Sequence, residues 1–170
     1  MNEIYTRRSV RSYSDKFVEE EKIEQILKAG MQAPSAGNQR PWEFIVVRDS
    51  DILKKLSKAS PYAKCVDKAP VAIVLIVNQD YLRFPEYTDQ DMGACAQNIL
   101  LEAVSQDLGA VWLGIAPMKK REEAVRKIFH LGDYLQPFAI IPIGYPQNVD
   151  ANHFTDRYQE KKVHYENFEN

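Results

Sequence analysis

The chain has 170 residues, of which 45% are hydrophobic and 27% are charged, and its formal net charge is −2 at pH 7. A chain of this length and composition can bury a core without disulfides or structural metals, and it differs strongly from disordered sequences. The nearly balanced charge excludes a global electrostatic attraction to nucleic acid or to an acidic membrane. We expect a single domain over residues 1–170 in which local charge clusters carry the function.

Cysteine usage and hydropathy indicate where such a protein works. Cys65 and Cys95 are far apart, with no CxxC motif and no paired histidines, so we expect no metal site and a reducing compartment. The start, MNEIYTRRSV, lacks the apolar core of a signal peptide. The longest strongly apolar run, VAIVLIV at 71–77, is too short to span a bilayer and predicts a strand buried on both faces. These features predict a soluble, cytoplasmic protein that does not engage membranes or nucleic acid.

Helical and extended patterns alternate along the first part of the chain. Apolar residues recur at helical spacing in 18–31, with acidic residues at the start of the segment and Lys28 near its end. WEFIVV at 42–47 predicts a strand. After it, Asp49 or Ser50 is expected to cap a short helix that continues through Lys58.

The segment 91–108, DMGACAQNILLEAVSQDL, is apolar over more than half of a helical wheel. A helix of this kind is buried on several sides, and we expect a second subunit to supply part of the cover. The following patterns predict a strand at 110–116, an amphipathic helix at 119–130 and a strand at 137–145. The order of these elements fits a three-layer α/β fold.

The tail 146–170 is polar and irregular, but it contains spaced apolar side chains: Phe154, Tyr158, Val163, Tyr165 and Phe168. Such a pattern favours an arm that lies on a surface, such as that of a partner, over a disordered tail. No strand is followed by G-x-G-x-x-G, which makes a Rossmann dinucleotide site unexpected. The sequence also lacks the GxxxxGK[ST], GxSxG and HExxH motifs.

Three short stretches have the composition of a binding site. In RRSVR, Arg7, Ser9 and Arg11 share one face if the chain is extended, whereas Arg7 and Arg11 share one if it is helical. Either arrangement suits a phosphate group, which accepts forked N–H bonds. The alternative for this stretch is a solvated basic N-terminus.

The second stretch, APSAGNQRPW at 33–42, predicts a tight loop. It can present backbone amides and the side chains of Asn38 and Gln39 to a planar polar ligand, or it can be an ordinary connection. The third stretch is WLGIAP, in which Gly114 permits a flat ring to approach the backbone. Here the alternative is a plain strand end.

Taken together and in this order, the motifs resemble the FMN-dependent nitroreductase family, in its short-chain branch. The resemblance covers nearly the whole chain and rests on five ordered blocks: RRSVRSYSDKFV, ILKAGMQAPSAGNQRPWEFIVV, KAPVAIVLIV, DMGACAQNILLEAVSQDLGAVWLGIAP and IPIGYP with DRYQEKKVHYENF. It implies a mostly antiparallel central sheet flanked by helices, with a C-terminal arm that reaches the partner subunit.

The resemblance also implies which residues hold the cofactor. The block that binds the phosphate, the ribityl chain and the pyrimidine edge of FMN is matched by Arg7, Arg8, Ser9 and Arg11. The loop that reaches the flavin of the other subunit is matched by Pro34, Ser35, Ala36 and Asn38. The strand end whose backbone amide faces the hydride-accepting nitrogen is matched by Leu113 and Gly114.

Two further positions complete the expected cofactor site. Arg157 matches a C-terminal arginine that binds the phosphate, and Lys64 is a weaker candidate for the pyrimidine oxygens. Thr155 departs from the pattern, because many relatives have a lysine there. The C-terminal arm therefore offers one fewer cation to the phosphate than it does in those relatives.

The implied activity is reduction of nitroaromatics, quinones or other flat electrophiles by NADH or NADPH, through tightly bound FMN and a ping-pong mechanism. No side chain is expected to act as a nucleophile, and the active sites are shared in a homodimer. Two alternatives remain open: a relative that uses reduced flavin for dehalogenation or flavin fragmentation, and a non-catalytic flavin-binding module. The segment 79–90, which carries three aromatic residues, either covers the site or is a packed surface loop.

Overall fold

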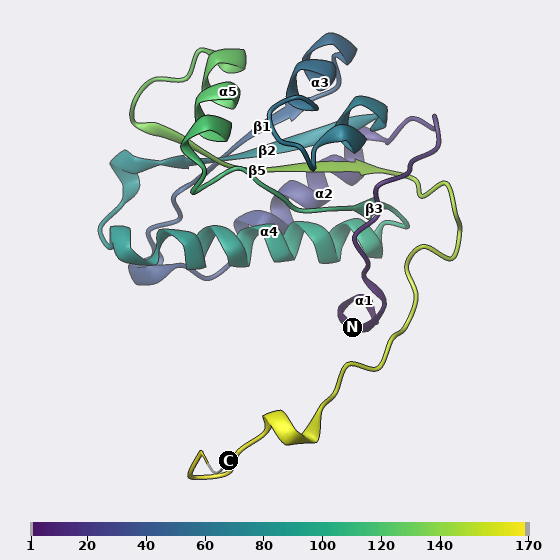
Figure 1. Cartoon of the computed structure of the whole chain (residues 1–170), viewed down its shortest axis with the longest axis vertical. Helices are drawn as coiled ribbons and strands as arrows, with labels where there is room; N and C mark the ends of the chain where they lie inside the picture. The colour runs from purple at the N-terminus through teal and green to yellow at the C-terminus, as the bar shows by residue number, and fades with distance from the viewer. Residues whose placement is uncertain (1, 169–170) are drawn as a thin grey trace.

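The computed structural model of the chain describes residues 2–168 and shows a five-stranded sheet between two layers of helices (Figure 1). The strands are β1 (Trp42–Val47), β2 (Val71–Asn78), β3 (Gly109–Ala110), β4 (Leu113–Gly114) and β5 (Leu135–Gly144). Their order is β1-β2-β5-β3, with β4 also paired to β5, and every strand pairing is antiparallel. The expected three-layer architecture with an antiparallel sheet is confirmed.

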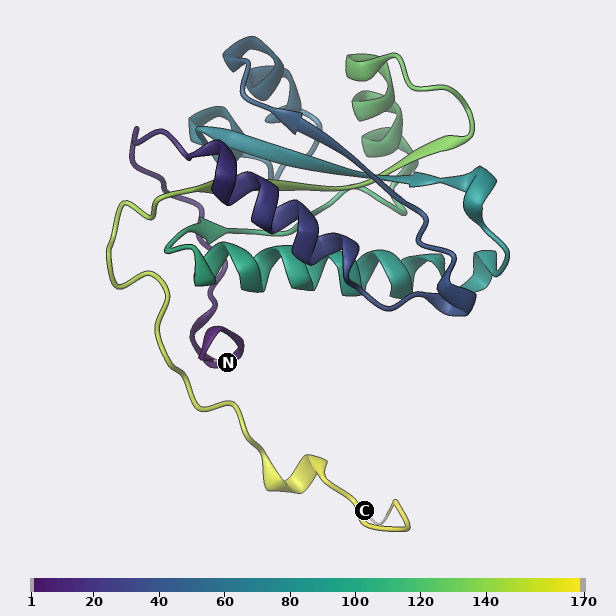
Figure 2. The same ribbon diagram turned by 180° about the vertical axis from the view of Figure 1, so that it is seen from behind.

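The helices divide between the two faces of the sheet (Figures 1 and 2). α2 (Glu20–Met31) and α4 (Thr88–Ser105) cover one face, and α3 (Ser50–Leu56) and α5 (Lys119–Phe129) cover the other. Each face has its own apolar cluster, and β2 supplies both, because its alternate side chains point to opposite faces. All eight residues of β2 are buried, as predicted for a strand covered on both sides.

The predicted helices are present, with shifted ends. α3 begins after Asp49, whose side chain accepts a hydrogen bond from the Ile52 amide at 2.9 Å and so caps the helix. α4 starts three residues earlier than predicted, at Thr88, and ends at Ser105. A short N-terminal helix, α1 (Glu3–Thr6), was not predicted. No helix of the described residues is long and apolar enough to cross a membrane.

The strand predicted at 110–116 is wrong in part, because it is broken into β3 and β4. Ala110 pairs with Ile143 and Leu113 pairs with Ile140 in one continuous register, which places Val111 opposite Pro142. Proline has no amide hydrogen, so the ladder cannot continue through that pair.

α4 is covered by the sheet and by α2, and much of its apolar surface is buried inside the chain, including Met92, Cys95, Ala96, Ile99 and Leu100. Asn98 donates a hydrogen bond of 3.0 Å to the Ala29 carbonyl of α2. Leu101 and Val104 are half-buried on a remaining side. Cover by a second subunit therefore stays a prediction, and it applies to a narrower face than the sequence suggested.

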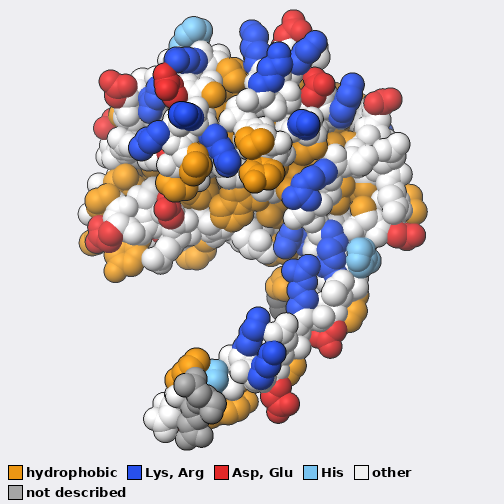
Figure 3. All heavy atoms as spheres, viewed as in Figure 1, with side chains coloured by type: hydrophobic (Ala, Val, Ile, Leu, Met, Phe, Trp, Pro, Cys, Tyr) orange, Lys and Arg blue, Asp and Glu red, His pale blue; other side chains and the backbone are white. Residues whose placement is uncertain are grey.

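The C-terminal segment departs from the body after Asn152. Every described residue from 153 to 168 is exposed, and one short turn, η5 (Glu160–Lys162), interrupts an otherwise irregular path. Figures 1 and 2 both show this arm, residues 153–168, running away from the sheet and helices. Figure 3 shows positively charged side chains along it.

Candidate functional site

The RRSVR stretch is extended and attached to the sheet. Ser9 forms an isolated parallel bridge with Ala110, and the Val10 amide donates to the Ala110 carbonyl at 3.0 Å. Val10 is buried against Gly109, where an added Cβ would lie only 2.7 Å from the Val10 Cβ. The RRSVR stretch is therefore extended and not helical, and the buried Val10 side chain fixes it beside β3.

Arg8 is held in place but has one unsatisfied donor. Its Nη1 donates to the carbonyls of Arg7 and Tyr5 at 2.7 and 3.2 Å. Its backbone amide donates to the side chain of Asn152. The buried Nη2 has no hydrogen-bond partner among the described residues. A buried donor without a partner is costly, so an acceptor from a ligand at this position would be stabilising.

Arg7, Arg8 and Arg157 line one hollow of about 220 Å³, together with residues that include Tyr5, Phe154, Thr155 and Asp156. Burial, and then the charges of Arg157 and Arg8, lower the pKa of Arg7 below its usual value. Arginine nevertheless stays protonated in proteins. Among the described residues, no ion pair joins any of the three to an acidic side chain. The hollow therefore has the electrostatics of an anion site.

Arg11 and Lys64 lie at a second position. The exposed Arg11 donates from Nη1 to the Ser9 carbonyl at 3.2 Å. Burial raises the pKa of the Cys65 thiol, and the nearby Arg11 guanidinium acts in the opposite direction. Lys64 precedes Cys65 and opens the turn η2 (Lys64–Lys68). The structure therefore places Arg11 near η2, apart from the three-arginine hollow.

Leu113 and Gly114 contribute backbone to the site. The Leu113 side chain is buried in the cluster under α3 and α5, so only its main chain is available to a ligand. Gly114 is exposed, and an added Cβ would have no neighbour closer than 3.9 Å, which leaves room for a flat group to approach. Arg121 donates from Nη1 to the Gly114 carbonyl at 3.0 Å and lies 5.5 Å from the Tyr62 ring centroid.

The loop at 34–38 is tightly constrained. The Ala36 amide donates to Asp91 Oδ1 at 2.9 Å, and Ser35 Oγ accepts from the Arg40 amide at 3.0 Å. Gly37 has a φ of 53° and could not carry a side chain, because a Cβ would lie 2.4 Å from the Phe84 ring. Asn38 also has a left-handed φ, of 56°. Such strain persists only where the surroundings hold the loop firmly.

Two groups of candidate residues, the 34–38 loop and the arginines around Arg8, lie at opposite ends of α4. The 34–38 loop is tied to Asp91 in the first turn of the helix. Arg8 is tied through Asn152 to the Leu108 carbonyl, just beyond the last turn. With a helical rise of 1.5 Å per residue, Asp91 and the last helical residue, Ser105, are about 21 Å apart along the axis. Within one chain, Pro34, Ser35, Ala36 and Asn38 therefore do not meet the arginines, as a site shared between two chains requires.

Comparison with known proteins identifies the chain. A model of the nitroreductase family matches residues 4–61 and 60–145. The chain belongs to the nitroreductase family. It is 42% identical over 163 residues to a "Putative NADH dehydrogenase/NAD(P)H nitroreductase" of Methanothermobacter thermautotrophicus, covering 96% of this chain and 84% of that protein.

Solved structures of this family have the same fold. A "Putative NADH Oxidase" of Clostridium acetobutylicum is 48% identical, with a TM-score of 0.95 over 98% of this chain and 99% of the other. An "FMN-dependent Nitroreductase" of Clostridium difficile is 32% identical, with a TM-score of 0.88 over 95% and 96% of the two chains. These similarities extend over the body and most of the arm.

Several residues that shape the candidate site were not found from the sequence. Asp91 holds the 34–38 loop, Asn152 holds Arg8, and Arg121 contacts Gly114. Gln39 was expected as a side chain that the loop could present to a ligand, but it is buried and hydrogen-bonded to Asp91 and to the backbone of Arg83 and Phe84. An acidic residue at the start of a long apolar helix was a usable signal for Asp91. No sequence signal pointed to Asn152 or Arg121, because Asn152 bonds to a residue far away in the chain and Arg121 bonds to a backbone carbonyl. No group of three or more metal-ligating side chains occurs within residues 2–168.

Proposed function

We propose that this protein is an FMN-dependent oxidoreductase that oxidises NADH or NADPH and reduces nitroaromatics, quinones or similar flat electrophiles. The donor and the acceptor would use one open site in turn, which gives a ping-pong mechanism. A cytoplasmic location, where both nicotinamide nucleotides are present, belongs to the same proposal.

The observation that carries the proposal is the hollow lined by Arg7, Arg8 and Arg157, in which Arg8 also keeps a buried Nη2 without a partner in the described residues. A terminal phosphate offers several acceptor oxygens and a double negative charge, so it fits three guanidiniums that form no ion pair with an acidic side chain of residues 2–168. The chain has no glycine-rich loop for a pyrophosphate, which favours FMN over FAD. Ser9, beside this hollow, would contact the same end of the cofactor.

Bound FMN supplies the redox chemistry, accepting a hydride from the nicotinamide and passing electrons to the acceptor. The chain binds and orients the groups around it. Arg11 and Lys64 would place positive charge at the pyrimidine edge, where negative charge accumulates on reduction. The exposed backbone at Gly114 would donate a hydrogen bond to the ring, and Arg121 would hold that backbone in place. No side chain needs to act as a nucleophile.

The functional unit would be a homodimer in which each site takes residues from both chains. The position of the 34–38 loop and of Arg8 at opposite ends of α4 supports this arrangement, because a two-fold partner can bring its loop to the arginines. The exposed aromatic residues of the arm and the half-buried Leu101 of α4 would lie in the interface. The C. difficile relative is named as FMN-dependent, which agrees with the cofactor proposed.

The visible spectrum of the purified protein tests this function. We expect a yellow protein whose extracted flavin is FMN, and anaerobic NADH or NADPH should bleach the flavin absorbance. With the nucleotide and a quinone varied together, double-reciprocal lines should be parallel. A protein that stays colourless after incubation with FMN would contradict the cofactor assignment.

Intersecting lines would contradict the single shared site. A flavin that binds but is not reduced by either nucleotide would support the non-catalytic alternative. Release of halide from a halogenated aromatic in place of quinone reduction would support the dehalogenation alternative.

A further inference from the structure

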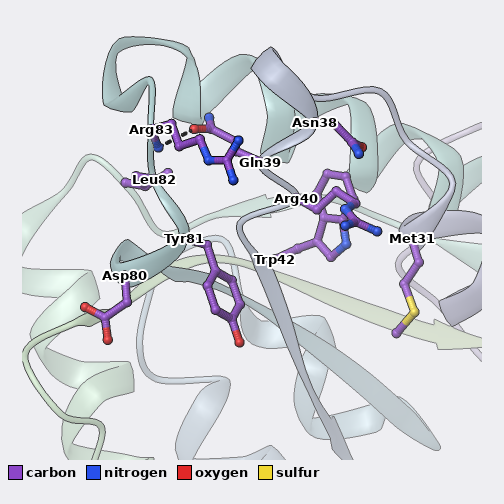
Figure 4. Close-up of a pocket in the computed structure, with 9 residues that line it drawn as sticks. All are labelled: Met31, Asn38, Gln39, Arg40, Trp42, Asp80, Tyr81, Leu82 and Arg83. Atoms are coloured by element: carbon purple, nitrogen blue, oxygen red, sulfur yellow. Dashed lines mark hydrogen bonds between the residues drawn. The ribbon is translucent and has the colours of Figure 1, made fainter.

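A second hollow, of about 550 Å³, lies beside the 34–38 loop and is distinct from the three-arginine hollow. Its volume is within the range of small-molecule sites in proteins. Figure 4 shows its lining, with Leu82, Arg83 and Tyr81 on one side and Asn38, Arg40 and Met31 on the other. Asn38 is the one candidate FMN residue in the lining of this pocket. The proposed function assigns no role to the other residues that line it.

One buried glutamine joins the two sides of this pocket. Gln39 Oε1 accepts from the amides of Arg83 and Phe84, both at 2.9 Å. Gln39 Nε2 donates to Asp91 Oδ2 at 2.6 Å and to the Phe84 carbonyl at 3.2 Å. Because all four hydrogen bonds are made, the segments 34–41 and 79–87 are held together as one preformed unit.

This unit presents two free guanidinium groups to the same space. The side chains of Arg40 and Arg83 make no ion pair or hydrogen bond with any residue in the described range 2–168. The one acidic lining residue, Asp80, points away from both arginines in Figure 4. Arg40 also has a left-handed φ of 46°, a conformation that a long side chain rarely adopts.

We propose that this pocket binds the phosphate groups of the dinucleotide co-substrate, with Arg40 and Arg83 as their ligands. The inference rests on the proposed function, in which the 34–38 loop reaches the flavin of the partner chain. A nicotinamide at that flavin would bring its pyrophosphate close to the same loop. Two unpaired guanidiniums suit this charge, and the half-exposed ring of Tyr81 offers a stacking surface for the adenine.

ADP-ribose and 2′-phospho-ADP-ribose test the pocket without any redox reaction. Both carry the phosphates and the adenine but no nicotinamide, and their binding to the FMN-loaded protein is measured by calorimetry. Arg40→Gln and Arg83→Gln should each weaken binding about tenfold or more, as expected for a lost charge-assisted hydrogen bond. Lys54→Gln removes an equal charge from exposed α3 on the other face and should leave binding unchanged.

The two probes separate the pyrophosphate from the 2′-phosphate. Equal losses for both probes assign the arginines to the pyrophosphate, and a loss confined to 2′-phospho-ADP-ribose assigns them to the 2′-phosphate and predicts a preference for NADPH. The proposal is overturned if neither probe binds the wild-type protein, if both arginine variants bind like wild type, or if Lys54→Gln is affected equally. Arg40→Lys and Arg83→Lys keep the charge and should retain part of the affinity, which guards against a folding artefact.

Reduction by 1-benzyl-1,4-dihydronicotinamide separates this inference from the function itself. That donor has no phosphate, so it should reduce the flavin of the arginine variants as fast as that of wild type. If variants lose ADP-ribose affinity and reduction by NADH but keep reduction by this donor, the pocket is assigned. If wild type is reduced by no dihydronicotinamide, the proposed function fails, whereas unchanged ADP-ribose binding in the variants overturns only the pocket.

Discussion

The N-terminal segment and the C-terminal arm bring arginines to the same hollow, but the fold holds them very differently. Val10 is 5% exposed and its amide bonds to β3, so Arg7 and Arg8 are fixed to the sheet. In the arm, Phe154 and Tyr158 are 63% and 70% exposed. Arg157 is close to Arg7, yet every described neighbour of it in the arm is solvent-exposed.

The difference shows which half of the phosphate site exists before the partner arrives. Fixing the backbone of one residue costs about 1–2 kcal/mol, and a buried aromatic or aliphatic side chain returns roughly 1.5–3 kcal/mol. The N-terminal segment gains that burial within its own chain, whereas the arm does not. We infer that Arg7 and Arg8 form a preorganised half and that Arg157 is added when the arm lies on a second surface.

Removing the arm should produce the largest effect. A chain that ends at Asn152 should unfold cooperatively, with a free energy of unfolding within about 0.5 kcal/mol of the full chain, because the removed side chains are exposed. It should nevertheless lose the dimer and most of its FMN. Sedimentation read at protein and flavin wavelengths measures both quantities.

The control for the truncation is the double variant Lys161→Gln, Lys162→Gln, which alters η5 but keeps the aromatic residues. It should remain dimeric and yellow. A truncated monomer that sediments with its full complement of FMN would show that the arm and the shared site are unnecessary.

Substitution of single arginines should weaken FMN binding less than removal of the arm does. It should also show that the N-terminal segment contributes more to the affinity than the arm. Arg8→Gln removes the buried donor and should weaken FMN binding by about 1.5–3 kcal/mol, or roughly 10- to 150-fold. Arg157→Gln should act in the same direction with a smaller loss, because its arm must first be ordered. Titration of the flavin-free proteins with FMN gives both values.

The substitution Thr155→Lys should have the opposite effect on FMN affinity. It adds a cation to the lining of the hollow and should tighten FMN binding. Equal affinities for wild type and all three variants would place the phosphate elsewhere.

The smallest expected effect is an alkaline loss of stability that originates in the body alone. Burial raises the pKa of Cys95 to about 12 and also raises that of Tyr13, whose hydroxyl donates to the Val10 and Pro142 carbonyls. Burial favours the neutral thiol and phenol, so each group has a higher pKa in the folded state than in the unfolded state. The stability that these neutral groups contribute to the folded state is complete below about pH 9 and is lost as the pH rises further. Each group contributes a slope of up to about 1.4 kcal/mol per pH unit.

Chemical denaturation at pH 8, 9 and 10 measures this slope. Cys95→Ala should make it shallower, and removal of the arm should leave it unchanged, since both groups lie in the body. A slope that vanished with the arm would locate the titrating groups outside the core.

Local patterns in the sequence determined much of this protein. The apolar run at 71–77 dictated a strand buried on both sides, and helical periodicity located α2, α4 and α5 to within a few residues. The chemistry of RRSVR was also readable, because closely spaced arginines suit a compact anion in either backbone conformation. These features depend on neighbours in the chain, and periodicity reports such neighbours directly.

Tertiary structure decided what distant residues do to one another. Pro142 interrupts the edge strand only because the register sets it opposite Val111, and Asp91 shapes the 34–38 loop only because the first turn of α4 lies beside that loop. The same folding separates the two groups of cofactor residues by the length of α4 and joins Arg40 to Arg83 through Gln39. No sequence period encodes these pairings, because they arise from packing between segments far apart in the chain.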